Sequence, residues 1–68
     1  MNATKQTKSA NAIANGTVVV SMLDGEDGTI LQAASYNRNR TKVWSYTVQT
    51  QYGREVWDTC DLFIPTSN

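Results

Sequence analysis

Residues 41–65, TKVWSYTVQTQYGREVWDTCDLFIP, decide the fold of this chain. Valine, tryptophan, tyrosine and threonine dominate the segment, and these residues favour strands. Gly53 interrupts the pattern, and glycine allows a tight turn at low conformational cost. We therefore predict strands over residues 41–50 and 54–60. The Asp-Leu-Phe-Ile-Pro end is expected to form one 3₁₀ turn and a short fifth strand that stops at Pro65.

The turn at Gly53 fixes which side chains of this hairpin face the core. A two-residue turn at Tyr52 and Gly53 places Val48 opposite Trp57, whereas a three-residue turn places Val48 opposite Val56. A slip of one residue exchanges the two faces of a strand. Because tyrosine is poorly suited to a left-handed turn position and glycine is well suited, we predict the three-residue turn. Val48, Val56 and Tyr46 then face the core, and Trp57 faces outward.

Two further strands precede this hairpin. Residues 16–23, GTVVVSML, form a short β-branched run that favours an extended conformation. The Asp-Gly-Glu-Asp-Gly sequence of residues 24–28 is typical of a turn. Residues 29–36, TILQAASY, follow as the second strand, although the alanines also suit a helix. The polar residues 37–40, Asn-Arg-Asn-Arg, connect to the third strand.

The chain has 68 residues, which corresponds to one domain. Residues 1–15 contain no acid, no aromatic and one large aliphatic residue, Ile13, so we predict a flexible, disordered tail. Residues 16–68 are expected to form an all-β domain of five short strands. Such strands close into a small barrel in many domains, because closure removes the unpaired edges that promote aggregation.

The composition argues against several functional classes. The chain has no histidine and one cysteine, Cys60, so the commonest general base and a structural zinc site are both absent. Asp24, Glu26 and Asp27 crowd one turn, but their spacing differs from that of a calcium-binding loop. We therefore predict a protein that is not an enzyme, with no catalytic residues, no metal site and no cofactor.

Localisation is predicted from the same features. No apolar run approaches the roughly 18 residues of a membrane-spanning helix. The first residues have no apolar signal-peptide core, and a small secreted domain would be expected to carry several disulfides. We predict a cytoplasmic protein without membrane contact.

The order of these motifs resembles the SH3-like barrels of the Tudor and KOW type. The resemblance covers residues 16–65 and depends on an apolar strand followed by DGEDGTI, YGRE and DLFIP. It implies a five-stranded SH3-like β-barrel that closes with a one-turn helix. Tudor domains bind methylated arginine or lysine in an aromatic cage, for which Tyr52 matches one position, while KOW domains contact RNA.

The residues themselves favour protein binding. Tryptophan and tyrosine commonly anchor protein interfaces, and an outward tryptophan in so small a domain suggests a surface that a partner covers. We predict contact with another protein, or with a second copy of this chain, through an aromatic face on the third and fourth strands. The predicted binding residues are Trp44, Tyr52, Arg54 and Trp57.

The alternative is nucleic-acid binding. Basic residues interleaved with aromatics can hold phosphates and stack on bases, although a dedicated nucleic-acid binder usually carries a net positive charge and this chain is formally neutral. The candidate residues are Tyr36, Arg38, Arg40 and Lys42, with Lys5 and Lys8 of the tail as additional cations.

Charge along the sequence suggests a dipolar molecule. The acidic turn of residues 24–28 and the basic residues 38–42 flank the predicted second strand. If residues 29–36 are extended, the two charged loops lie at opposite ends of that strand. Opposite poles would attract a partner of mixed charge, or a second copy packed head-to-tail.

Overall fold

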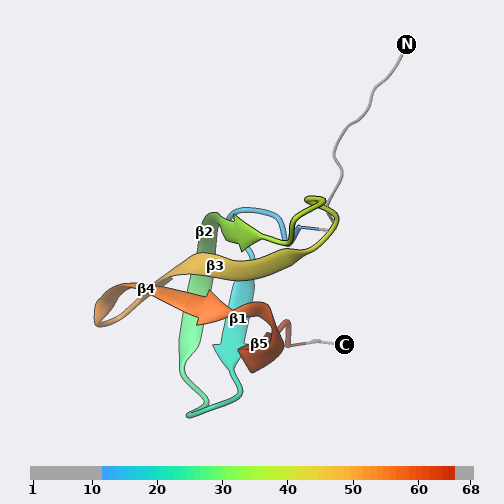
Figure 1. Ribbon diagram of the computed structural model, residues 1–68. Coiled ribbons are helices and arrows are strands. Elements are labelled where there is room, and N and C mark those ends of the chain that lie inside the picture. Colours follow the sequence, from blue (N-terminus) through green and yellow to red (C-terminus); the bar gives the residue numbers. More distant parts are fainter. Residues whose placement is uncertain (1–11, 66–68) are drawn as a thin grey trace.

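The computed structural model describes residues 12–65, which fold into one antiparallel β-sheet (Figure 1). A three-residue 3₁₀ turn precedes the last strand, and no helix among the described residues is long and apolar enough to cross a membrane. The elements in chain order are β1 (Val18–Ser21), β2 (Asp27–Tyr36), β3 (Val43–Thr50), β4 (Gly53–Asp58), η2 (Thr59–Asp61) and β5 (Leu62–Phe63).

The five strands pair in the order β4-β3-β2-β1-β5. The prediction of an all-β, five-stranded domain is therefore confirmed. The predicted closed barrel is not, because β4 and β5 lie at the two ends of the sheet and do not pair with each other. β5 has two residues, and among the described strands it pairs with β1 alone.

β2 is the strand that bends the sheet. It is extended over its ten residues, so the helical alternative for this segment is excluded. Its pairing with β3 shifts register at three places between Ile30 and Tyr36. Such irregularities bend a strand and increase its twist. The β3–β4 hairpin consequently crosses over β1 and β2 instead of continuing a flat sheet (Figure 1).

The predicted register of the β3–β4 hairpin is wrong. Thr50 pairs with Gly53, which places Val48 opposite Glu55 and Tyr46 opposite Trp57. Gly53 does adopt the positive φ expected of it, at 118°, but pairing already begins at this residue. The slip exchanges the faces of β4.

Two side chains of β4 therefore take the opposite orientation to the one predicted. Val56 points outward and is 64% exposed. Trp57 is partly buried and packs against the core instead of facing outward.

Apolar side chains from four strands form the core. They are fully or almost fully buried: Val19, Ile30, Val43, Tyr46, Val48 and Leu62. Ile13 also packs against this cluster, and its backbone N–H donates to the Tyr46 hydroxyl at 2.8 Å. The ordered domain thus begins before residue 16, while residues 1–11 of the predicted tail lie outside the described residues.

We predict that Gly28→Ala destabilises the domain. A Cβ at Gly28 would overlap Cγ1 of Val48 and lie 3.1 Å from Cη2 of Trp57. Overpacking of this kind costs about 1–3 kcal/mol, which denaturant unfolding would measure. In a Val48→Ala background the clashing methyl is absent, so the same glycine substitution should cost clearly less. Equal costs in the two backgrounds would contradict this packing.

Candidate functional site: an acidic groove beside Trp57

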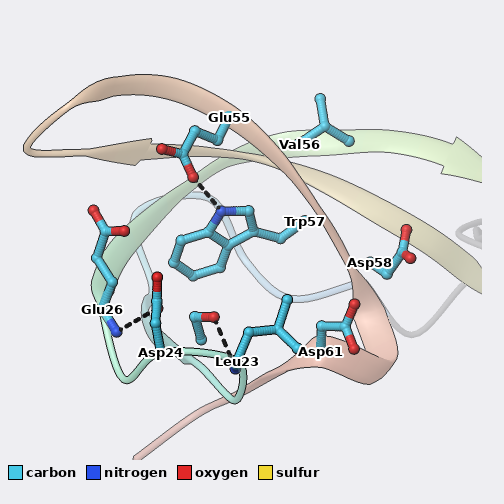
Figure 2. Close-up of a pocket in the computed structure, with 9 residues that line it drawn as sticks. Leu23, Asp24, Glu26, Glu55, Val56, Trp57, Asp58 and Asp61 are labelled. Atoms are coloured by element: carbon cyan, nitrogen blue, oxygen red, sulfur yellow. Dashed lines mark hydrogen bonds between the residues drawn. The ribbon is translucent and has the colours of Figure 1, made fainter.

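A groove of about 250 Å³ lies on the open side of the sheet, between β4 and the turn that joins β1 to β2 (Figure 2). Because β4 and β5 do not pair, no strand of residues 12–65 fills this space. We call it the acidic groove. Its lining residues come from the β1–β2 turn, β4 and η2: Ser21, Leu23, Asp24, Glu26, Glu55, Val56, Trp57, Asp58 and Asp61.

Trp57 forms the aromatic wall of the acidic groove. Its six-membered ring packs over Gly28 of β2, where the absence of a side chain makes room for it. Its indole N–H donates to Oε1 of Glu55 at 2.8 Å. Figure 2 shows the indole with Asp24 and Glu26 on one side and Asp58 and Asp61 on the other. The ring is thus fixed in position and surrounded by carboxylates.

Short hydrogen bonds hold the turn opposite Trp57. Oδ1 of Asp24 accepts the backbone N–H of Glu26 at 3.0 Å, an arrangement that commonly stabilises turns around aspartate. The Ser21 hydroxyl accepts the N–H of Leu23 at 3.1 Å. The N–H of Met22 donates to the Asp61 carbonyl at 2.7 Å, which attaches η2 to the turn. The rim of the groove is therefore an ordered structure.

A second, shallower hollow adjoins the acidic groove and shares Asp24 and Glu26 with it. We call it the side hollow, and its other lining residues are Gly25, Asp27, Gln51 and Tyr52. All six acidic residues of the chain line one or both of these depressions. None of the four basic residues in the described part of the chain lines either of them. The negative charge is thus collected on one face.

One oxygen in the acidic groove is buried without a partner. Oε2 of Glu26 accepts no hydrogen bond from the described residues. A buried polar atom without a partner destabilises a protein by about 1–3 kcal/mol, and a charged one by more. Within residues 12–65 no group of three or more carboxylate or cysteine side chains is arranged to hold a metal ion.

Of the four predicted protein-binding residues, Trp57 and Tyr52 line the two adjoining depressions, and Trp44 and Arg54 line neither. Trp57 lines the acidic groove, whereas Tyr52 is 76% exposed at the β3–β4 turn and lines the side hollow. Trp44, 60% exposed, borders a largely apolar hollow that also contains Cys60 and Lys42 and that shares Asp58 with the acidic groove. Arg54 is exposed opposite Gln49 on the outer face of the hairpin.

The residues of the nucleic-acid alternative do lie together. Asn37 organises residues 37–42, here called the basic loop, because its Oδ1 accepts the N–H of Thr41 at 2.8 Å and its own N–H donates to the Lys42 carbonyl at 3.0 Å. The guanidinium of Arg40 lies 4.1 Å from the ring centre of Tyr36, a cation–π contact. Arg38 and Lys42 are exposed. Lys5 and Lys8 lie outside the described residues.

The acidic groove was not predicted as one site. Asp24, Glu26 and Asp27 stand out in the sequence as a crowded turn, and Asp58 and Asp61 as a separate pair. Only the bend of β2 brings the two groups to one side of the molecule. The neutral net charge gave no sign of this segregation, because it sums over both ends of the fold.

No family model matches the chain, and neither a curated protein nor a solved structure is significantly similar to it. The Tudor- and KOW-type resemblance stays a prediction from short motifs. The function must therefore follow from the geometry and charge of the surface.

The two tryptophans should respond differently to substitution. Trp57→Phe removes the N–H donor to Glu55 and the ring atom that contacts Gly28, so we expect a loss of about 1–3 kcal/mol in the free energy of unfolding. Trp44→Phe alters an exposed side chain and should change stability by less than about 0.5 kcal/mol. Urea unfolding of both variants checks this, and similar losses would contradict the assigned position of Trp57.

Proposed function

We propose that this chain is a small non-enzymatic binding module whose acidic groove takes arginine or lysine side chains of a protein partner. The observation that supports the proposal is the arrangement of all six carboxylates around two adjoining depressions whose aromatic members are Trp57 and Tyr52. A cation in this position has both an aromatic face and negative charge beside it.

The physical preference for a cation has two sources. Contact of an ammonium or guanidinium group with an aromatic face contributes about 0.5–2 kcal/mol, depending on how far it is desolvated. Each partly exposed ion pair adds about 0.2–1 kcal/mol. Several weak interactions of this size together give a specific but reversible contact.

The size of the groove favours side chains over a small-molecule substrate. Its volume of about 250 Å³ lies below the roughly 300–1,000 Å³ of typical small-molecule sites. One or two long side chains fit it. Leu23 and Val56, both largely exposed at its rim, provide apolar contact for the stems of those side chains.

A peptide titration tests the proposal. In a Trp44→Phe background, Trp57 is the remaining tryptophan and its emission reports on the groove. We expect saturable quenching or shifting by a nine-residue peptide of alternating glycine and arginine. The same peptide with glutamate in place of arginine should have no effect. Affinity should decrease as salt is raised, because the attraction between exposed charges is screened.

Matched variants localise the binding. Asp24→Asn and Asp61→Asn keep the size of each side chain and remove its charge. Together they should lower the affinity for the arginine peptide by about two- to tenfold. Arg54→Gln on the outer face should leave the affinity unchanged. Unaltered binding by the groove double variant, or loss of binding in the Arg54 variant, would assign the contact to another surface.

Nucleic-acid binding through the basic loop is the second candidate, favoured by the contact between Arg40 and Tyr36. A single-stranded oligonucleotide retained on a filter at low salt, and released steeply as salt rises, would support it. Arg38→Gln with Lys42→Gln should then reduce retention, whereas Asp24→Asn with Asp61→Asn should not. Absence of retention at low salt would contradict this candidate.

A further inference from the structure

We propose that the basic loop of one copy of this chain inserts into the acidic groove of another, so that the protein associates head-to-tail. The inference rests on the proposed function of the groove and names its partner. It commits to residues 37–42 of a second copy as the occupant. Charge complementarity within the chain itself is the observation that carries it.

The two surfaces have opposite charge. Arg38, Arg40 and Lys42 give the basic loop a formal charge of +3. The acidic groove and side hollow together contain the chain's six carboxylates. Because the six basic and six acidic residues cancel, two copies do not repel each other through net charge. Segregated charge on a neutral molecule therefore favours an ordered, pole-to-pole encounter.

The basic loop is preorganised as the inserting element. Besides the backbone contacts of Asn37, the Asn37 side-chain amide donates to the Thr41 hydroxyl at 2.8 Å. Arg40 adopts a φ of 57°, a conformation that is uncommon for residues other than glycine, asparagine and aspartate. Its guanidinium is held at the Tyr36 ring. Little backbone entropy remains to be lost when such a loop binds.

The acidic turn and the basic loop lie at opposite ends of one strand. The acidic turn ends at the start of β2 and the basic loop begins at its end, and β2 is a continuous ten-residue strand. The strand keeps the acidic turn apart from the basic loop, whereas the β4 side of the groove lies nearer to the loop, because Asp58 and Lys42 line the same hollow. Because different patches meet, the contact is heterologous, and heterologous contacts either close into rings or continue as open chains.

Sedimentation equilibrium at low salt tests the inference. The weight-average mass should rise with concentration beyond twice the 7.5 kDa of one chain, and should fall back to one chain in 0.5 M salt. Arg38→Gln with Lys42→Gln should stay monomeric, and so should Asp24→Asn with Asp61→Asn. Arg40 is left unchanged because its contact with Tyr36 shapes the loop.

Mixing the two double variants gives the sharpest result. The first retains an intact acidic groove and the second an intact basic loop, so an equimolar mixture has one functional contact. The mixture should form a 1:1 dimer and no larger species. A Lys5→Gln, Lys8→Gln variant serves as the control for the other basic segment and should associate like the unaltered chain.

Each contrary result has a distinct meaning. A chain that stays monomeric at 1 mM in low salt overturns the inference, and arginine-peptide binding would then show that the proposed function of the groove stands without it. Self-association that persists in either double variant places the contact elsewhere. Loss of association in the Lys5, Lys8 variant would identify the N-terminal segment as the occupant and overturn the inference as well.

Discussion

The structure depends on the contact between Trp57 of β4 and Gly28 of β2. These residues lie 29 positions apart in the chain and meet because the bend of β2 brings the β3–β4 hairpin across β1 and β2. A glycine is required because any Cβ would overlap Val48. The indole N–H of Trp57 orients the Glu55 carboxylate. The carboxylates of the β1–β2 turn and of η2 lie around the indole ring. Trp57 therefore belongs both to the packing of the core and to the candidate site.

The open side of the sheet is maintained by the same residues that make it a site. Closing the sheet would bring β4 against the β1–β2 turn and β5. Glu55 and Asp58 of β4 carry the same charge as Asp24 and Glu26 of the turn, and close approach of like charges is unfavourable. The indole of Trp57 also occupies the space between the two sides. The carboxylates and Trp57 therefore disfavour closure of the sheet, and the groove results from this.

Much of the strand content followed from the sequence, whereas the register did not. Val18 to Val20 and the aromatic residues of β3 have strong intrinsic β-propensity, so local reasoning located those strands within a few residues. Gly53 was correctly expected to take a positive φ. The pairing of Thr50 with Gly53 is a property of the whole sheet. Burial of Trp57 over Gly28 selects this register, and no local feature of the Gln51-Tyr52-Gly53 turn contains that information.

The charge distribution shows why composition alone describes this surface poorly. A formal charge of zero argues against attraction to nucleic acid or to an acidic surface when the charges are mixed. Here β2 separates the cations of residues 38–42 from the carboxylates at its other end. The potential near each end then reflects the local charge, because screening at physiological salt reduces the influence of the far end beyond about 8 Å. A partner approaching either end encounters a strongly charged surface, and a neutral chain can discriminate between cationic and anionic partners by which end it presents.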